Sequence, residues 1–214
     1  MNDKIGILLV EDDPVWRTML TKFLDQEPDM RVLAAAASKE EAIAFCANNK
    51  ADVVLMDIHL AGGNSDGIEA TLELSLMGCA AKIIALTTLN NEDVVIDAFT
   101  AGALQFISKS DFRTIPDVIR SVVRSPDTPQ EILVKEFRRL KEFELYSRLT
   151  EAEREIVSLY EKGYTRSHIL NVLGKSESTV KNQVTAILRK FNARSMKEVI
   201  HLIRSRGLSR KESE

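Results

Sequence analysis

Five side chains suited to phosphoryl chemistry stand at the ends of short apolar runs in the first half of this 214-residue sequence. Carboxylates held close together repel one another unless a cation joins them. Oxygen ligands with room for water suit Mg²⁺, and a nearby hydroxyl and ammonium would stabilise the oxygens of a phosphoryl group in transfer. The five residues are Glu11, Asp12, Asp57, Thr87 and Lys109.

The apolar runs predict the framework that would bring these residues together. Each run is short enough for a buried strand, and the segments between them have helical periodicity. Alternating strands and helices imply a parallel sheet covered on both faces, with sites outside the carboxyl ends of the strands. The predicted strands are Ile5–Val10, Val32–Ala36, Val53–Met56, Ile83–Leu86 and Gln105–Ser108.

Any one of the polar residues alone is well explained as a solvated residue at the start of a loop. Their ordered placement at four strand ends makes that explanation weak for the set. The sequence therefore predicts an α/β domain whose sheet edge holds Mg²⁺ and handles a phosphoryl group.

The charge of the chain is unevenly distributed. The whole sequence has a net charge of −3, but residues 1–125 hold 11 Lys and Arg against 19 Asp and Glu, whereas residues 126–214 hold 18 against 13. The proline-containing segment Ser125–Pro129 separates the acidic part from the basic part. Two domains with different partners are expected: residues 1–125 and 148–214. They are joined by a linker, residues 126–147, that contains an amphipathic helix.

Other features limit the class of protein. Two cysteines, Cys46 and Cys79, are too few for a disulfide scaffold, and no apolar run is long enough to cross a bilayer. The first residues do not resemble a signal peptide. A cytoplasmic protein without a membrane partner is expected.

The second half shows only helical periods. An amphipathic helix is expected over Gln130–Ser147, with its apolar stripe packed on its own domain in preference to forming a coiled coil. Four capped helices then follow, because Thr150, Thr165, Ser176 and Ser195 each fit an N-cap. Capping boxes are expected for Thr150 with Glu153 and for Ser195 with Glu198. The apolar stripe comprises Leu133, Phe137, Leu140 and Phe143.

The second and third capped helices, with the turn Gly174–Ser176 between them, have the layout of a helix-turn-helix. The helix Glu177–Phe191 places its apolar residues on one face and Lys181, Asn182 and Thr185 on the other. Lysine and asparagine can contact base edges in the major groove of DNA, and basic residues also bind phosphates. Flanking positive charge comes from Lys175, Arg189, Lys190 and Arg194.

The first domain resembles the receiver domains of two-component response regulators, which have a flavodoxin-like, doubly wound (βα)₅ fold. The resemblance implies that Asp57 accepts a phosphoryl group from a sensor histidine kinase. It also implies that Asp12 and Asp57 bind Mg²⁺ directly, that Glu11 acts through water, and that the backbone carbonyl of His59 is a ligand. The matching segments are Ile7–Asp13, Val53–Asp57, Ala85–Thr87 and Phe106–Lys109.

The same resemblance implies a switch. Thr87 and Lys109 would contact the phosphoryl oxygens, and the aromatic side chain of Phe106 would turn inward when Thr87 moves toward them. The loop after Asp57 is longer than is usual in the family and lacks a proline often found there. Neither departure removes a site residue.

Residues 149–208 look like the LuxR-type (NarL/FixJ-class) DNA-binding domain, an all-α helix-turn-helix module. The matches include Leu149–Val157, Ser176–Lys181 and Ile187–Phe191. The resemblance implies that Lys181, Asn182 and Thr185 meet base edges, and that Thr179 and Arg189 contact the DNA backbone. Asn192 stands where glycine is common in the family.

Together these features predict a transcriptional response regulator that binds double-stranded DNA, as a homodimer when active. It would not be an enzyme beyond slow self-dephosphorylation of Asp57. The main alternative is a phosphorelay or protein-interaction regulator whose helical domain binds a protein. A Mg²⁺-dependent phosphatase with Asp57 as nucleophile is disfavoured, because His59 stands where such a site needs a carboxylate. A ligand-sensing quorum regulator is disfavoured by the receiver residues.

Overall fold

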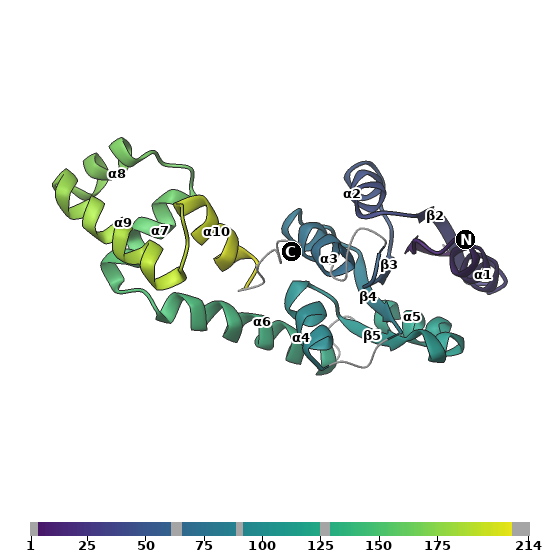
Figure 1. Cartoon of the computed structure of the whole chain (residues 1–214). Helices are drawn as coiled ribbons and strands as arrows, with labels where there is room; N and C mark the ends of the chain where they lie inside the picture. The colour runs from purple at the N-terminus through teal and green to yellow at the C-terminus, as the bar shows by residue number, and fades with distance from the viewer. Residues whose placement is uncertain (1–3, 61–65, 89–91, 125–128, 207–214) are drawn as a thin grey trace. The chain divides into compact units, whose positions relative to one another are not determined.

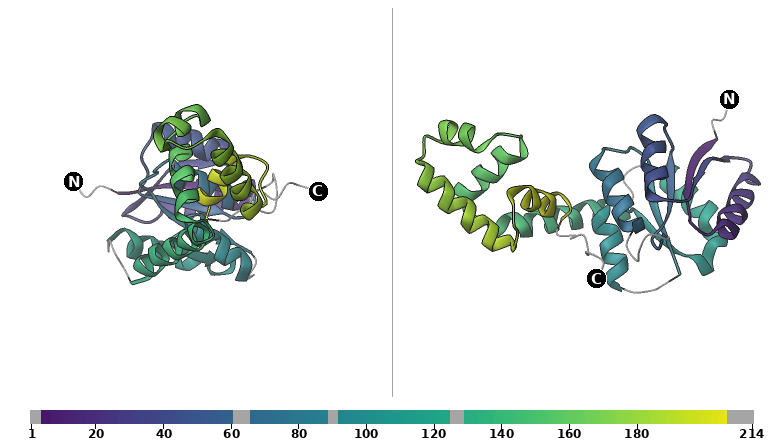
Figure 2. Two further views of the ribbon diagram at one scale, coloured as in Figure 1. Left: turned by 90° about the vertical axis from the view of Figure 1, so that its left-hand side faces the viewer. Right: turned by 45° about the horizontal axis from the view of Figure 1, so that its top comes forward.

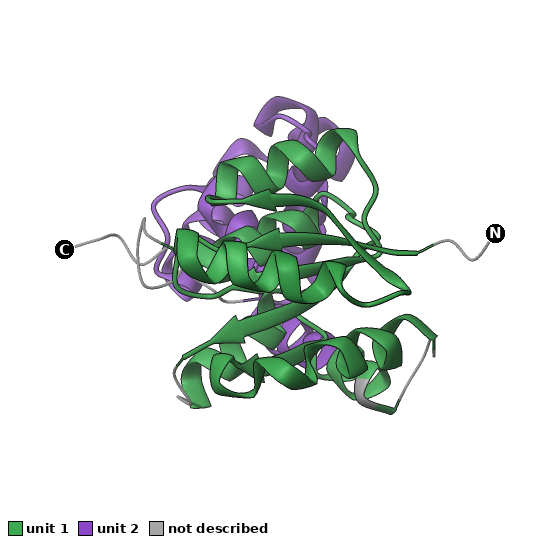
Figure 3. Ribbon diagram, turned by 90° about the vertical axis from the view of Figure 1, so that its right-hand side faces the viewer, with its two compact units in different colours: residues 1–137, 210–214 green, residues 138–209 purple. Residues whose placement is uncertain are grey.

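The computed structural model describes residues 4–60, 66–88, 92–124 and 129–206 (Figure 1). The chain forms two compact units, coloured separately in Figure 3. The first reaches Phe137 and the second begins at Arg138. Helix α6, Pro129–Ser147, contributes to both units, and the predicted domain boundaries stay predictions.

The first unit is built on a five-stranded parallel sheet with the order β2-β1-β3-β4-β5. The predicted α/β fold is confirmed, and each predicted strand is present, three of them longer by one or two residues. The strands are β1 Ile5–Val10, β2 Met30–Ala36, β3 Val53–Asp57, β4 Lys82–Thr87 and β5 Gln105–Ser108. The helices are α1 Pro14–Asp25, α2 Lys39–Asn48, α3 Asp66–Leu76, α4 Glu92–Ala101, the 3₁₀ helix Lys109–Thr114 and α5 Ile115–Arg124.

Helices cover both faces of this sheet, so its central strands are apolar on both sides. Successive residues of β1 point to opposite faces of the sheet, so Leu8 and Leu9 enter different cores. Leu9 packs with Leu20 of α1 and Ile119 of α5, whereas Leu8 packs with Leu74 of α3. This period of two explains why the strands appear in the sequence as continuous apolar runs.

Helix α1 begins directly after the acidic residues at the end of β1. Asp13 is its N-cap, and its side chain accepts hydrogen bonds from the backbone N–H groups of Val15 and Trp16. Pro14 occupies the first helical position, where no N–H is needed. The cap fixes the course of the chain directly after the acidic residues of the site.

The first turn of α6 is anchored on the sheet by an ion pair. Lys82 Nζ, at the start of β4, lies 2.6 Å from Glu131 Oε1, and the Glu131 side chain is almost fully buried. A buried carboxylate that loses its cation is left with an uncompensated charge. The pair therefore ties the beginning of α6 to the strand that ends in Thr87.

Lys82→Met is expected to lower the free energy of unfolding of the first unit by about 1–3 kcal/mol, because the buried Glu131 carboxylate loses its ion pair with Lys82. Urea denaturation followed by circular dichroism measures the change. Lys82→Met/Glu131→Leu removes both charges and should recover most of the loss. A double variant no more stable than Lys82→Met would contradict the assigned role of the pair.

The second unit is helical, and α7, α9 and α10 pack on one another around a separate apolar core (Figure 2). Val180, Ile187 and Phe191 of α9 enter this core, as their spacing predicts. None of the helices in the described part of the chain is both long enough and apolar enough to cross a membrane. The helices are α7 Glu151–Glu161, α8 Arg166–Leu173, α9 Glu177–Phe191 and α10 Met196–Arg204.

The predicted caps of the second unit are confirmed with one difference. Thr150 and Glu153 form a reciprocal capping box at α7. At α10, Ser195 accepts from the N–H of Glu198, but Glu198 Oε2 accepts from the N–H of Arg194. The predicted capping box at Ser195 is therefore wrong in its second bond, because the glutamate reaches one residue further back.

A larger difference concerns α6. Its apolar stripe is expected to pack on its own domain, but Leu133, Leu140 and Phe143 are exposed and only Phe137 is half-buried. The residues of α6 that are buried, Glu131 and Leu145, lie on the opposite face of the helix. Hydrophobic periodicity identifies the stripe, but it does not identify the surface that the stripe contacts.

Candidate functional site

The carboxyl ends of β1, β3 and β4 and the residue after β5 bring the predicted site residues together. Lys109 Nζ lies 2.8 Å from Asp57 Oδ2 and 2.7 Å from Glu11 Oε2. Glu11, Asp57, Thr87 and Lys109 are all buried. Residues separated by up to 98 positions in the sequence therefore form one ionic cluster at the sheet edge.

The cluster has two carboxylates and one ammonium, and this imbalance governs its protonation. Burial, followed by the negative charge of Asp57, raises the pKa of Glu11 to about 7, although the hydrogen bond from Lys109 acts in the opposite direction. Burial lowers the pKa of Lys109, but its bonds to Asp57 and Glu11 outweigh that effect and raise the pKa above the ordinary value. Lys109 is therefore a fixed cation next to Asp57.

The acidic residues also fit a divalent cation. One carboxylate oxygen from each of Glu11, Asp12 and Asp57 lies within 4.8 Å of the others. Glu11 Oε2 is buried and lies beside Lys109 Nζ without a well-directed hydrogen bond. These carboxylate oxygens suit Mg²⁺, which keeps several water ligands when it binds a protein. Because Asp12 is only half-buried, water can reach this side of the site.

His59 contacts two other members of the site. Its backbone N–H donates to Asp57 Oδ1 at 3.1 Å, and its ring Nδ1 lies 3.4 Å from Thr87 Oγ1. The role predicted for its backbone carbonyl stays a prediction. Phe106 is half-buried on β5, the strand next to β4, which ends in Thr87. Its role as a switch residue stays a prediction.

Arg17 is a site residue that the sequence analysis misses. Its Nη1 donates to the backbone carbonyls of Glu11 and Asp12, at 2.7 and 2.9 Å. The guanidinium reaches back from α1 and holds the backbone that carries both acids. A basic residue one turn inside a helix that follows an acidic cluster is the signal that could have identified it.

Trp16 and Phe112 form an aromatic wall beside the cluster. Lys109 Nζ lies 5.5 Å from the centre of the Trp16 ring, and the Trp16 and Phe112 rings meet edge to face at 6.0 Å. A cation over an aromatic face is stabilised electrostatically. This wall therefore helps to hold Lys109 toward Asp57.

Gly67 is a second residue that the sequence analysis misses. A Cβ added to this second residue of α3 would lie 1.9 Å from the backbone oxygen of Asp57 and 2.6 Å from Cα of Ile58. The Gly67 N–H instead donates to the Ile58 carbonyl at 3.1 Å. Only glycine lets α3 approach the backbone of Asp57 this closely. The loop residues 61–65 before it, including the Gly62–Gly63 pair, lie outside the described residues.

Gly67→Ala is expected to lower the free energy of unfolding by about 1–3 kcal/mol, because the added methyl group meets backbone that has no room to yield. Phosphoryl transfer to Asp57 should slow as well, since the backbone of that residue must shift. Gly78→Ala is the control: Gly78 has φ +74° and no atom near its Cβ position. This control should lose stability without slower phosphorylation. Equal phosphorylation rates in the two variants would contradict the steric argument.

The helix-turn-helix layout is also present. Helix α8 ends at Gly174, which adopts φ +59°, and Ser176 caps α9. All five predicted DNA-contacting residues are exposed on α9: Thr179, Lys181, Asn182, Thr185 and Arg189. At the end of α9, Asn192 adopts φ 50°, a conformation that asparagine tolerates better than most residues.

Two of the flanking basic residues are already paired. Lys190 Nζ lies 2.5 Å from Glu153 Oε2, and Lys175 Nζ lies 3.6 Å from Glu155 Oε2. Their charge is partly neutralised within the unit. These two lysines therefore offer less positive charge to DNA than the sequence alone suggests.

Comparisons with known proteins agree with this geometry. Residues 7–120 match the family model of the response regulator receiver domain, and residues 147–203 match that of bacterial regulatory proteins of the luxR family. The chain belongs to the response regulators. This response regulator is similar to VraR of Staphylococcus aureus, described as a response regulator protein: 32% identical over 199 residues, covering 92% of this chain and 94% of VraR.

Solved structures give the same assignment. A LuxR-family two-component response regulator from Aurantimonas sp. SI85-9A1 is 28% identical, with a TM-score of 0.53, over 64% of this chain and 99% of that one. The response regulator domain of Thermotoga maritima CheB is 29% identical, with a TM-score of 0.51, over 58% of this chain and 99% of that one. The predicted family and fold of this response regulator are confirmed.

Proposed function

We propose that this response regulator is controlled by phosphorylation of Asp57 and binds double-stranded DNA through α9, in the cytoplasm and as a homodimer when active. The observation that carries the proposal is the buried cluster of Glu11, Asp57 and Lys109 in a chain that also bears an exposed recognition helix. The phosphoryl donor would be a sensor histidine kinase. Apart from slow self-dephosphorylation, the chain would have no enzymatic activity.

Asp57 would act as the nucleophile. One carboxylate oxygen would form a bond to phosphorus while the bond between phosphorus and the donor's histidine nitrogen breaks, giving an acyl phosphate. Lys109 would neutralise charge on the phosphoryl oxygens, and the Thr87 hydroxyl would donate to one of them. A resident Mg²⁺, held by Asp12 and Asp57 with Glu11 and the His59 carbonyl nearby, would supply further charge stabilisation.

The same contacts would produce the switch. The phosphoryl group adds about −1.5 to −2 charge at pH 7 and three acceptor oxygens, beside a lysine that already lies against Asp57. Thr87 would leave its contact with His59 to reach these oxygens, and Phe106 would occupy the space it vacates. Such a change can only bias two conformations that the domain already samples.

Lys181→Ala is expected to weaken binding to the cognate DNA site by about 1–3 kcal/mol and to relax sequence preference, if Lys181 contacts a base. Lys197→Ala is a matched control, because Lys197 is an exposed lysine on α10. Fluorescence anisotropy with specific and scrambled duplexes measures both effects. An unchanged affinity and preference for Lys181→Ala would argue against its assigned contact.

Genomic footprinting of cells with wild-type protein or Asp57→Ala tests the whole function. Wild type should occupy discrete sites that are depleted in the variant. A gel shift across a salt series then separates DNA binding from the protein-binding alternative, since phosphate contacts make log affinity fall with log salt concentration. Absence of salt-dependent DNA binding by the phosphorylated protein would favour a protein partner for the second domain.

A further inference from the structure

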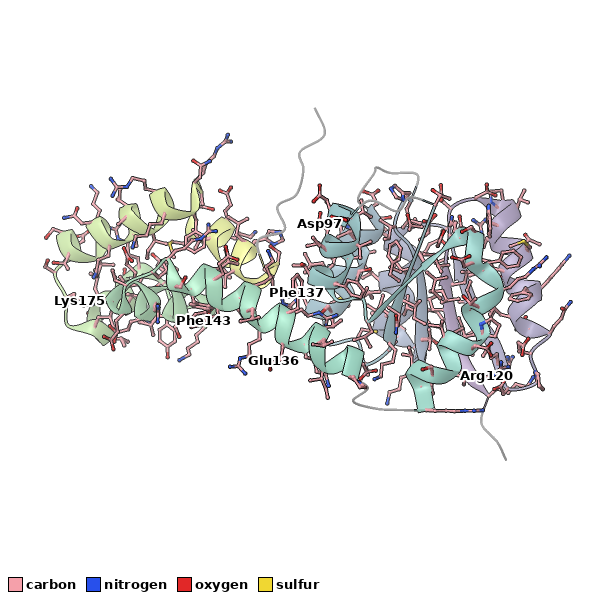
Figure 4. All side chains as sticks on the ribbon, turned by 90° about the horizontal axis from the view of Figure 1, so that it is seen from below. Asp97, Arg120, Glu136, Phe137, Phe143 and Lys175 are labelled. Carbon is pink, nitrogen blue, oxygen red and sulfur yellow. The ribbon has the colours of Figure 1, made fainter. Side chains whose placement is uncertain are left out.

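The two cysteines of the chain, Cys46 and Cys79, come together in the first unit. Both pack against the same apolar core cluster, and both line a cleft of about 720 Å³. Asp52 and Lys82 also line this cleft; the first precedes β3 and the second begins β4. The cleft therefore lies at the end of the sheet opposite the phosphoryl site. Figure 4 draws the side chains with sulfur in yellow.

The end of helix α3 fixes the position of Cys79. Gly78 adopts φ +74°, and its N–H donates to the Ser75 carbonyl at 3.2 Å. The N–H of Cys79 donates to the Leu74 carbonyl at 3.0 Å. These two bonds form a Schellman motif, in which the residue after the glycine packs back on its own helix. Leu74 and Cys79 accordingly belong to one core cluster.

Cys46 lies in the last turn of α2, on the face that enters the same core. Ala42, one turn earlier on this face, is fully buried. Helices α2 and α3 pack on each other (Figure 1). The Cys46 thiol lies close enough to Cys79 for a hydrogen bond between the two side chains. Two cysteines can be bridged without backbone movement only when their side chains face each other in this way.

We propose that Cys46 and Cys79 are an oxidation site that forms a reversible disulfide when the protein meets a hydroperoxide. The proposal goes beyond the proposed function and depends on neither phosphorylation nor DNA binding. In a reducing compartment the pair would stay as two thiols. Disulfides that form in such a compartment are usually transient and catalytic or redox-sensing.

The surroundings of the pair set the order of its reactions. Burial, followed by the charge and the hydrogen bond of Cys79, raises the pKa of the Cys46 thiol to about 12, so Cys46 is a neutral thiol at pH 7. Because the thiolate is the nucleophile, Cys79 would attack first. A bond forms between its sulfur and the terminal oxygen of the peroxide while the O–O bond breaks. The other oxygen leaves as an alcohol, or as water from hydrogen peroxide, with the proton of the Cys79 thiol.

Cys46 would complete the disulfide. Its sulfur bonds to the sulfur of Cys79, the S–O bond of the sulfenic acid breaks, and the hydroxyl group leaves as water with the proton of Cys46. Overall, two thiols lose two electrons and two protons, and one hydroperoxide becomes one alcohol and one water. A dithiol reductant would restore both thiols through a mixed disulfide.

The bridge would close the segment of chain that contains β3 and α3. Such a cross-link restricts the unfolded chain, and it stabilises the folded state when the native geometry accepts it without strain. The midpoint of thermal unfolding of the first unit should therefore rise by about 5–10 °C on oxidation. Trp16 is the single tryptophan of the chain and lies in this unit, so its fluorescence follows the transition.

The decisive experiment treats the full-length protein with hydrogen peroxide, then denatures it and alkylates the remaining thiols with N-ethylmaleimide. Mass spectrometry of wild type should find no alkylated cysteine and should find the peptides that bear Cys46 and Cys79 cross-linked within one chain. Dithiothreitol should restore both alkylation sites. A parallel sample of N-acetylcysteine shows that the oxidant was sufficient.

Two single variants test the order of attack, with circular dichroism to confirm that each is folded. Cys46→Ser removes the resolving sulfur, so dimedone should trap Cys79 as its sulfenic acid. Cys79→Ser leaves Cys46 alone, and the dimedone adduct should be at least about tenfold less abundant, because burial keeps that thiol neutral.

Three results would overturn the proposal. In the first, both thiols of wild type remain alkylatable after N-acetylcysteine is consumed. In the second, the two cysteines oxidise separately to sulfinic acids or pair between two chains. In the third, the oxidised first unit unfolds at a lower temperature than the reduced one, which means that the bridge distorts the fold. Equal dimedone labelling of the two variants would refute the assignment of Cys79 as the attacking sulfur.

Discussion

Asp57→Ala is expected to abolish phosphorylation of the chain by a small-molecule phosphodonor or by its kinase. The variant lacks the oxygen that bonds to phosphorus, and the neighbouring Glu11 is held by Lys109. Intact-protein mass spectrometry at neutral pH measures the acid-labile phosphoryl group directly. Asp52→Ala is the matched control, because Asp52 lies at the other end of β3, where its carboxylate accepts the N–H of Gly6. It should be phosphorylated like wild type.

The same variant should keep its fold, which separates loss of chemistry from loss of structure. Removing Asp57 removes one of the two carboxylates that share Lys109, so a single ion pair with Glu11 is left. The pKa of Glu11 should fall from about 7, because the Asp57 charge helps to raise it. The free energy of unfolding should therefore be unchanged or higher. Full phosphorylation of Asp57→Ala would refute the acceptor assignment.

The sequence predicts the first unit well because two physical signals agree there. Buried parallel strands must be apolar on both faces, which makes runs such as Val53–Asp57 distinct from their surroundings. Polar residues that end those runs must meet at one sheet edge, whatever the details of packing. Asp57, Thr87 and Lys109 could therefore be placed together from topology alone.

The contacts that the sequence does not reveal depend on how separate elements approach one another. Gly67 matters because α3 touches the backbone of Asp57, and a distance between two elements is not encoded in local periodicity. Arg17 acts on backbone carbonyls, which have no sequence signature. The exposure of Leu133, Leu140 and Phe143 on α6 is missed for the same reason: an amphipathic pattern shows that one face of a helix is apolar, but not what covers that face.

Lys109→Met is expected to destabilise the first unit strongly when divalent cations are removed with EDTA. Two buried carboxylates, Glu11 and Asp57, then share the site without a cation, and breaking a buried ion pair in this way costs about 3–5 kcal/mol. Lys39→Met is the control, because the partners of Lys39, Glu69 and Glu73, are partly exposed. Its loss of stability should be much smaller. Urea denaturation of both variants beside wild type measures the difference.

The destabilisation should depend on pH in a defined direction. The pKa of Glu11 is raised from 4.5 to about 7 in the folded protein, and it should rise further without Lys109, whose hydrogen bond and charge lower it. Between the unfolded and folded pKa values the native state binds more protons, so stability falls as pH rises through this range. Relative to wild type, Lys109→Met should therefore be least affected near pH 4.5 and most affected above pH 7.

Mg²⁺ should reverse much of this loss. An ion that binds the folded state but not the unfolded chain stabilises by mass action, and in Lys109→Met it would replace the missing positive charge beside Glu11 and Asp57. The denaturation midpoint of the variant should rise with Mg²⁺ concentration more steeply than that of Lys39→Met. Phosphorylation should remain impaired even at saturating Mg²⁺, because the lysine contact with the phosphoryl oxygens is absent. A variant as stable as wild type in EDTA at pH 8, or one indifferent to Mg²⁺, would show that Lys109 does not compensate these carboxylates.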